Sequence, residues 1–180
     1  MPTTSTVLLI IFLRASRRGW TEQSLKHDHG PMGNIFNDDF RDFIMALNNE
    51  SVRYILVGGF SVILHGYSRT TGDMDIWVDQ TEENYRCVTN AFGRFGMPVF
   101  DMTQDNFLYH PVWDVFSFGS PPSAIDLMVK VKGLNFNECF ENSVVFEEGG
   151  LKIRTINLND LKHAKRSSAR PKDINDLENL

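Results

Sequence analysis

Residues 52–78 read VRYILVGGFSVILHGYSRTTGDMDIWV, and this stretch decides the fold. Its first part, Val52–Val57, is a short β-rich run that stops at Gly58-Gly59, as a strand ending in a tight turn would. Residues 60–65 then fit a short helix, and residues 73–78 form another segment of β type. The order strand, glycine turn, helix and strand is therefore expected at the centre of the chain.

The second of these strands begins with two carboxylates. Asp73 and Asp75 stand at i and i+2, so their side chains point to the same face of the sheet. Met74 and Ile76 point the other way and are apolar, so we expect that face to be buried and the acidic face to meet a cleft or solvent. Two carboxylates at this spacing can share divalent cations, which lie about 3.5–4 Å apart in two-metal phosphoryl-transfer sites.

A third carboxylate stands on a later β segment, where Asp126 lies between Ile125 and Leu127. Three carboxylates brought close together repel one another unless a cation neutralises them, so metal binding would stabilise such a cluster. The local pattern alone favours the simpler interpretation, in which Asp126 is a strand residue that faces solvent.

The glycine turn has two interpretations as well. Gly58 and Gly59, followed by Ser61, fit a turn whose backbone N–H groups approach an anion at the start of a helix. A Gly-Gly pair between a strand and a helix is also common turn chemistry with no ligand, and the spacing is not that of a P-loop or a dinucleotide fingerprint.

Working outward, the pattern alternates helices and strands. A helix should begin after Asn37 and end near Asn48, because apolar residues fall at i, i+3, i+4 and i+7 behind an acidic first turn. A second helix, residues 82–95, has Thr81 as its N-cap. Further strands are expected at 112–118, 124–131, 144–146 and 151–156, and helices at 159–168 and 171–180. The fold class is α/β (α+β), a sheet with helices packed on it.

Length and composition limit the alternatives. A chain of 180 residues with net charge −5 supports one domain and excludes a large multidomain enzyme. Cys87 and Cys139 have no spacing typical of a zinc site or a disulfide framework, and we expect reduced thiols in a cytoplasmic protein. The longest apolar run, Val7–Leu13, is too short to span a membrane. We interpret residues 1–31 as a poorly ordered or non-native leader and residues 32–180 as the working domain, so that translation could start at Met32.

The three motifs together resemble the nucleotidyltransferase superfamily typified by DNA polymerase beta, particularly its small bacterial-type members. Val57-Gly58-Gly59, Asp73-Met74-Asp75-Ile76 and Ile125-Asp126-Leu127 match, in order, the hydrophobic-Gly-Gly, Asp-x-Asp and separate acidic motifs of that family. The resemblance implies a mixed central sheet flanked by helices. It also implies transfer of a nucleoside monophosphate from a nucleoside triphosphate, ATP for example, to an acceptor hydroxyl, with release of pyrophosphate.

Site roles follow from the same resemblance. Asp73, Asp75 and Asp126 would be the catalytic and metal-binding residues, holding two Mg²⁺ ions, with Asp126 helping the acceptor oxygen to lose its proton. The triphosphate would bind at the glycine turn and at cationic or polar residues, namely Gly58, Gly59, Ser61, Arg69, Thr70 and Lys165, with Arg170 and Lys172 as further candidates.

Several residues keep a structural alternative. Arg69 could touch phosphate or form an ion pair, and the basic segment with Lys165 could equally be a solvated helix face. His65 and Trp77 could contact the nucleotide or fill the core. An aromatic stretch could form the acceptor pocket or simply pack inside, and it contains Phe107, Tyr109 and Trp113.

Two functions are compatible with the sequence. The first is an active Mg²⁺-dependent nucleotidyltransferase whose acceptor is a protein, a tRNA or a small molecule. The second is a catalytically weak nucleotide-binding member that acts in a toxin–antitoxin pair, with an antitoxin as partner. The three intact carboxylates favour the first, because a degenerate site would be expected to have lost an acid. The chain has no room for the further domains with which a polymerase grips a template.

Overall fold

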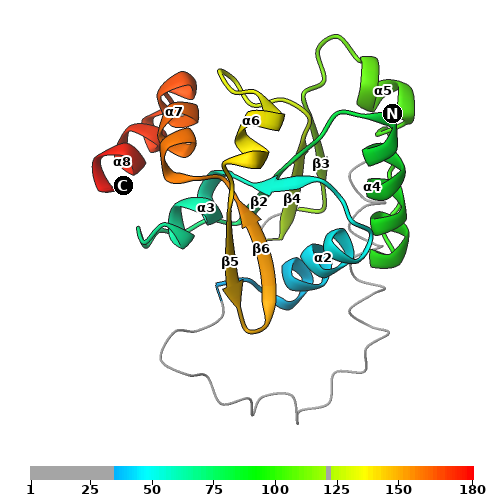
Figure 1. The fold of residues 1–180 in the computed structure, drawn as a ribbon, viewed down its shortest axis with the longest axis horizontal. Coiled ribbons are helices and arrows are strands. Elements are labelled where there is room, and N and C mark those ends of the chain that lie inside the picture. The colour runs from blue at the N-terminus through cyan, green and yellow to red at the C-terminus, as the bar shows by residue number, and fades with distance from the viewer. Residues whose placement is uncertain (1–34, 121–122) are drawn as a thin grey trace.

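The computed structural model describes residues 35–120 and 123–180 (Figure 1). The predicted leader, residues 1–31, and the possible start at Met32 lie outside the described residues. The strands are β1 Tyr54–Leu56, β2 Asp73–Val78, β3 Val115–Phe118, β4 Ala124–Met128, β5 Val144–Glu148 and β6 Leu151–Thr155. The helices are α2 Asp38–Asn49, α3 Gly58–Leu64, α4 Glu82–Phe95, α5 Gln104–Tyr109, α6 Phe136–Glu141, α7 Leu158–Ser168 and α8 Pro171–Asn179.

The six strands form one mixed sheet in the order β3-β4-β2-β1-β6-β5. The central strand β2 pairs antiparallel with β1 and parallel with β4. At the two ends of the sheet, β3 pairs antiparallel with β4, and β5 pairs antiparallel with β6. The predicted α/β class with a mixed central sheet and flanking helices is confirmed.

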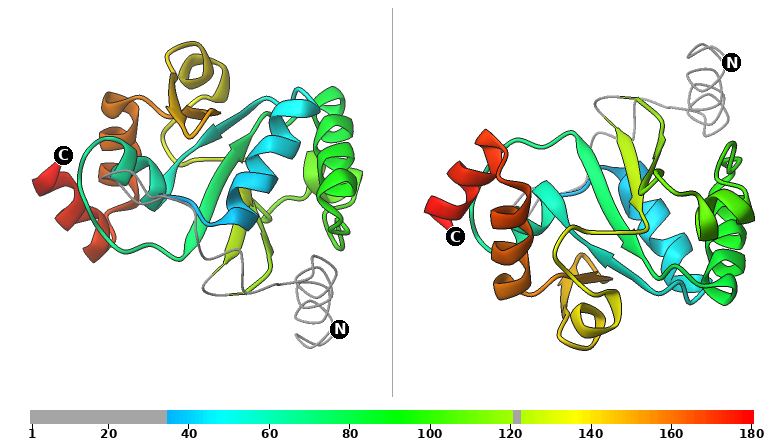
Figure 2. Two further views of the ribbon diagram at one scale, coloured as in Figure 1. Left: turned by 90° about the horizontal axis from the view of Figure 1, so that it is seen from below. Right: turned by 90° about the horizontal axis from the view of Figure 1, so that it is seen from above.

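The two faces of the sheet are covered differently. Helices α2 and α4 lie side by side on one face (Figure 2), where Met74 and Ile76 are fully buried in the main core. On the opposite face a smaller core covers only one end of β2, where Trp77 stacks edge-on against Phe136 of α6 at 5.2 Å between ring centroids. Helices α7 and α8 lie together at the far end of the molecule (Figure 2). Near the start of β2 the smaller core does not cover this face, and the carboxylates lie there.

Local signals explain where the long helices begin. The Asn37 side chain accepts a hydrogen bond from the Phe40 N–H at 2.8 Å and caps α2, and the Thr81 side chain caps α4 through the Asn84 N–H. Helix α4 ends at Gly96, which has φ +80°. The predicted bounds of β2 and α4 match the structure.

Other boundaries were predicted wrongly. Strand β3 begins at Val115 rather than at Val112, because the N–H groups of Val112 and Trp113 donate to the His110 ring instead of to a neighbouring strand. The short helices α5 and α6 were not predicted. Each has six residues, too few for a readable period, although Thr103 and Asn135 supply ordinary side-chain N-caps. Among the described helices, none is both long and apolar enough to cross a membrane.

Candidate functional site

The register of the sheet brings the predicted carboxylates onto two neighbouring strands. Asp75 of β2 lies directly beside Asp126 of the parallel strand β4, and Asp73 lies opposite Ala124 one step along the same face. Asp73 is exposed, whereas Asp75 and Asp126 are half-buried. The three acids predicted from separate motifs therefore share one face of the sheet.

The glycine turn packs directly against Asp75. Gly58 has φ +64°, and a Cβ at this position would lie 2.5 Å from the Asp75 Cγ, so a side chain here would overlap the carboxylate. The Gly59 N–H donates to the Asp75 carboxylate, and a Cβ on Gly59 would lie 2.8 Å from the Thr71 Cβ. Gly58 is thus required by its backbone conformation and by close approach, and Gly59 by close approach alone.

Ser61 has a structural place in this turn. Its side chain is fully buried, and its hydroxyl donates to the Gly58 carbonyl at 2.8 Å. This bond fixes the conformation of the turn at the start of α3. A direct contact from Ser61 to a triphosphate, as predicted, stays a prediction and would require this buried hydroxyl to change its partner.

The environment of Asp75 opposes its negative charge. Burial, and then the neighbouring charge of Asp126, raises the pKa of Asp75 above its ordinary value. The Gly59 N–H and the more distant charges of Lys172 and Arg170 lower that pKa and offset only part of the rise. A cation between the two carboxylates would relieve the repulsion and keep both ionised.

The donor set suits a hard cation. Carboxylate oxygens are the ligands that Mg²⁺ prefers, and Asp75 and Asp126 supply them from adjacent strands, with Asp73 on the same face. Within residues 35–120 and 123–180, no three His, Cys, Asp or Glu side chains already converge as a ready-made metal site. The residues therefore fit a cation shared by two carboxylates, with Asp73 as a third donor once its exposed side chain turns inward.

Two of the predicted cationic ligands, Lys165 and Arg69, lie in a buried charge network. The Lys165 Nζ lies 3.1 Å from Asp173 Oδ1 and 2.6 Å from Asp176 Oδ2, and its side chain is 6% exposed. The Arg69 guanidinium binds the same Asp176 carboxylate at 2.6 Å. The network ties α7, α8 and the loop before β2 together, and triphosphate binding by Arg69, the adjacent exposed Thr70 or Lys165 stays a prediction.

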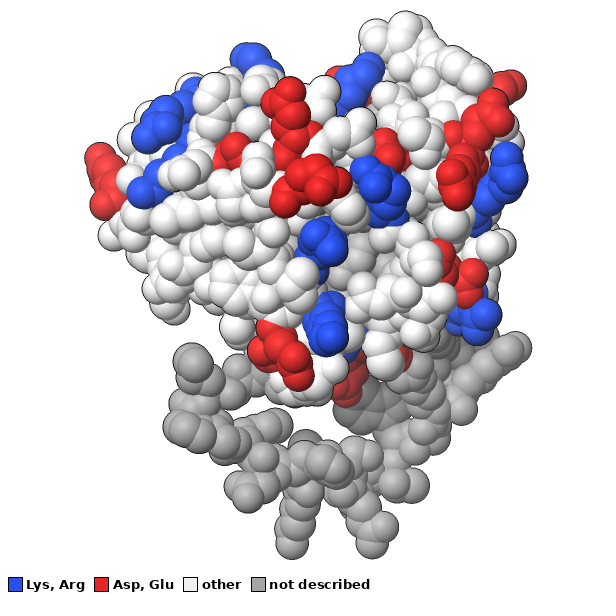
Figure 3. All heavy atoms as spheres, viewed as in Figure 1, with Lys and Arg blue, Asp and Glu red and all other residues white. Residues whose placement is uncertain are grey.

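Helix α8 also carries charge towards the acids. Burial alone would raise the pKa of Asp173, but hydrogen bonds from Arg170, Ser168 and Lys165 outweigh it and lower that pKa to about 2. The ionised Asp173 holds Arg170 at the start of α8, where Arg170 and Lys172 act electrostatically on Asp75. Figure 3 shows Lys and Arg side chains gathered at the upper left, over α7 and α8.

The residues with a structural alternative divide into two groups: His65, Trp77 and Phe107 are packed, whereas Tyr109 is 69% exposed and Trp113 40% exposed. His65 Nε2 lies 2.7 Å from the Ile156 carbonyl oxygen, and its ring stacks edge-on against Phe146. Trp77 is 2% exposed, and its indole N–H donates to the Val129 carbonyl. Trp77 therefore belongs to the smaller core, whereas His65 is half-buried and packs beside it.

One site residue was missed. Ser117 of β3 lies opposite Asp126, and its hydroxyl donates to Asp126 Oδ1 at 2.6 Å. No local signal in the sequence marks it, because the contact depends on how β3 and β4 pair. The row Ser117, Asp126 and Asp75 crosses three strands on one face.

Comparison with known proteins identifies a family and a similar fold. A family model described as "Nucleotidyltransferase of unknown function (DUF6036)" matches residues 38–180. Among solved structures, the crystal structure of a proposed nucleotidyltransferase from Thermotoga maritima is similar, with a TM-score of 0.50 and 17% sequence identity, over 78% of this chain and 88% of that one. A comparison with curated proteins finds no match.

Proposed function

Because the chain belongs to the DUF6036 nucleotidyltransferase family, we propose that it is a Mg²⁺-dependent enzyme that transfers a nucleoside monophosphate from a nucleoside triphosphate to an acceptor hydroxyl, releasing pyrophosphate. One observation carries the proposal. Asp75 and Asp126 lie side by side on parallel strands, and Gly58 leaves no space between the turn and the Asp75 carboxylate. Such a site brings paired carboxylates into contact with a glycine turn of the kind that can accept a phosphate.

The carboxylates would hold the metal. Asp75 and Asp126 are the primary ligands, with Asp73 added from the exposed start of β2. Bound Mg²⁺ would neutralise charge that develops on the phosphoryl oxygens and on the departing pyrophosphate. Burial, and then the charge of Asp126, raises the pKa of Asp75, and a cation at this position would counter both effects.

The other residues position the reactants. The Gly58-Gly59 turn would lie against the triphosphate, with the Gly59 N–H turning to it once a metal ion takes up the Asp75 carboxylate. Arg170 and Lys172 would supply positive charge from the start of α8. The Asp126 carboxylate would accept the proton of the acceptor hydroxyl, while the Ser117 hydroxyl holds its other oxygen in place. Three further residues would contact the triphosphate if its binding rearranges the charge network in which they lie: Arg69, Thr70 and Lys165.

The alternative, a nucleotide-binding member of a toxin–antitoxin pair without turnover, makes a different prediction. Such a protein would bind the triphosphate and Mg²⁺ but release no pyrophosphate. The retained carboxylates Asp73, Asp75 and Asp126 support turnover, since nucleotide binding alone does not need all three.

The test compares three proteins. Wild type, Asp75→Asn and Glu141→Gln are incubated with Mg²⁺, a cell extract and each nucleoside triphosphate labelled at the α-phosphate. Glu141 is an exposed acid on α6 and serves as the matched control. We expect transfer of label by wild type and by Glu141→Gln and its loss in Asp75→Asn. Equal transfer by Asp75→Asn would contradict the proposed site, and calorimetric Mn²⁺ titration of the same proteins reports metal binding without turnover.

A further inference from the structure

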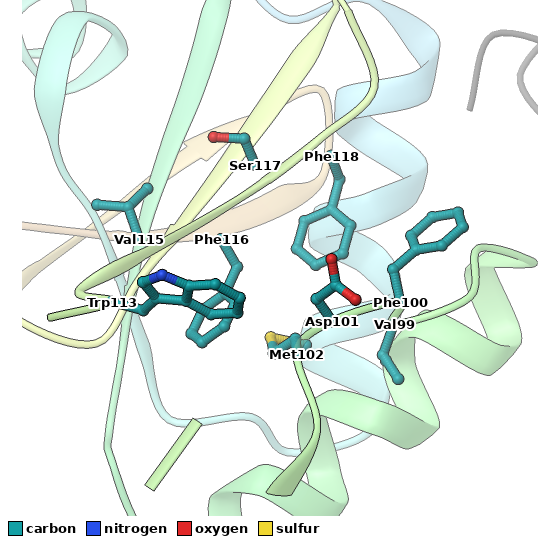
Figure 4. Close-up of a pocket in the computed structure, with 9 residues that line it drawn as sticks. All are labelled: Val99, Phe100, Asp101, Met102, Trp113, Val115, Phe116, Ser117 and Phe118. Carbon is teal, nitrogen blue, oxygen red and sulfur yellow. The ribbon is translucent and has the colours of Figure 1, made fainter. Parts of the chain in front are cut away.

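A cavity of about 220 Å³ lies beside the outer edge of β3, between this strand and residues 99–102 (Figure 4). Seven of the nine residues that line it have apolar or aromatic side chains, and Phe100 and Trp113 are each 40% exposed. The only charged side chain among the lining residues is that of Asp101. The cavity is therefore suited to an apolar group and unsuited to a phosphate.

The neighbouring strand edge is available for pairing. Within the described part of the chain, β3 is the last strand on its side of the sheet. The Val129 N–H donates to the Asp114 carbonyl, so residues 114, 116 and 118 exchange hydrogen bonds with β4 and the alternate residues do not. The N–H and C=O groups of Val115 and Ser117 thus point outward, as in sheets that accept an added strand.

Successive side chains of β3 point to two different faces of the sheet, one with the acids and one with the cavity. Ser117 points to the face that carries the acids, where it contacts Asp126. Phe116 and Phe118 point to the opposite face, and in Figure 4 their rings lie on the cavity side while the Ser117 side chain turns away. A strand added to β3 would present its side chains alternately to the cavity and to the acids.

We infer that the acceptor is a polypeptide segment that pairs with the outer edge of β3 and carries a tyrosine hydroxyl to Asp126, an inference that rests on the proposed function. Adjacent strands lie about 4.8 Å apart, so the residue paired with Ser117 stands roughly 10 Å from the Asp126 backbone. Serine and threonine are too short to cover that span, whereas tyrosine can extend over Ser117. Its two neighbours in sequence are apolar and face the cavity.

The reaction balances without a further reagent. The tyrosine oxygen bonds to the α-phosphorus of the nucleoside triphosphate, and the bond from that phosphorus to the oxygen bridging it to the β-phosphate breaks. The hydroxyl proton passes to the Asp126 carboxylate, and pyrophosphate leaves. The products are a tyrosine nucleoside monophosphate ester and pyrophosphate.

Charge around the edge favours a polypeptide over a nucleic acid. No Lys or Arg lines the cavity, Asp101 is negative, and Asp105 is exposed on the adjoining helix α5. A nucleic-acid backbone requires several cationic contacts, whereas the lysine beside the start of β3, Lys130, is already paired with Asp114 at 3.1 Å. A peptide with basic flanks would be attracted to the acids.

The experiment uses synthetic peptides as probes. Each has basic ends, and its single tyrosine either lies between two apolar residues or has the apolar residues moved one position further away. Wild type, with Mg²⁺ and labelled nucleoside triphosphate, should label the first peptide at tyrosine at least tenfold faster than the second. In the second peptide the apolar residues lie on the same face of the strand as the tyrosine, so the peptide cannot direct its tyrosine to Asp126 and its apolar residues to the cavity at the same time.

Variants of the protein test the edge itself. Val115→Pro removes an outward N–H without removing a bond to β4, and should lower peptide labelling at least tenfold, while Val115→Thr keeps the N–H and most of the labelling. Trp113→Ala opens the cavity and should also reduce labelling, whereas Val145→Ala on the opposite edge strand β5 should not. Circular dichroism melting confirms that each variant is folded.

Equal labelling of both peptides, or by Val115→Pro and wild type, would overturn the inference. So would transfer to a nucleic acid or to a small molecule but to no tyrosine peptide, and in that case the proposed function stands. If no acceptor, water included, gives pyrophosphate release that depends on Asp75, both the inference and the proposed function are overturned.

Discussion

Replacing Gly58 by alanine tests the contact between the glycine turn and the acids. An alanine Cβ would lie 2.5 Å from the Asp75 Cγ and 2.8 Å from its Cβ, on a residue with φ +64°. The carboxylate must therefore move or the turn must open. Either change separates the turn from Asp75.

The loss of stability has two parts. A left-handed conformation costs a residue with a side chain roughly 1–2 kcal/mol relative to glycine. Crowding of a packed site adds about 1–3 kcal/mol, so we expect Gly58→Ala to lower the free energy of unfolding by about 2–5 kcal/mol. Displacing a reacting group by about 1 Å costs roughly 100-fold in rate, so activity should fall at least that far.

Gly150→Ala is the matched control. Gly150 has φ +76°, in the turn between β5 and β6, and nothing lies within 4 Å of the position that its Cβ would take. It should show only the conformational cost, about 1–2 kcal/mol, and keep full activity. Urea unfolding gives both free energies, and pyrophosphate release gives the rates. Equal destabilisation of the two variants, with activity retained in Gly58→Ala, would refute the contact.

Three further changes give separate readouts. Burial, and then the charge of Asp126, raises the pKa of Asp75, so above that pKa the ionised carboxylate lowers the stability of the folded state. This penalty disappears as pH falls toward the ordinary value of 3.8. Without Mg²⁺, the inactive variant Asp75→Asn should therefore melt at a higher temperature than wild type at pH 8, and the difference should shrink near pH 4. Lys165→Met removes the cation shared by two buried carboxylates, which keep Arg69 and Arg170 as partners, and should cost about 1–3 kcal/mol in urea unfolding. Arg166→Ala, on the exposed side of α7, should change stability by no more than ~0.5 kcal/mol. Lys172→Ala removes a charge that lowers the pKa of Asp75, so the acid limb of the pH–rate profile should move to higher pH and the Kd for nucleoside triphosphate should rise with little change in Tm.

The predictions that succeeded depend on short-range patterns. The bounds of β2 and α4, the caps Asn37 and Thr81, and the burial of Met74 each follow from a few neighbouring residues. Alternation along a strand is a property of the backbone, so the shared face of Asp73 and Asp75 could be inferred directly. The same reasoning could not settle whether Asp126 faced these acids, because that depends on which strands pair.

The predictions that needed the tertiary structure concern groups distant in sequence. Lys165 was singled out as a cation near phosphate, but the packing of α7 against α8 gives it Asp173 and Asp176 as partners. Ser117 carried no signal, and only the pairing of β3 with β4 brings it to Asp126. In both cases the decisive contact is set by the register or packing of whole elements.

The sequence by itself determined the chemistry that is available: a glycine turn after one strand, two acids on one face of the next, and a third acid on a later strand. Tertiary structure decided which of these groups meet and which charges are already paired. The physical reason is the range of the forces involved. Backbone geometry and capping act over a few residues, whereas strand register, burial and ion pairs depend on elements that the chain brings together only when it folds.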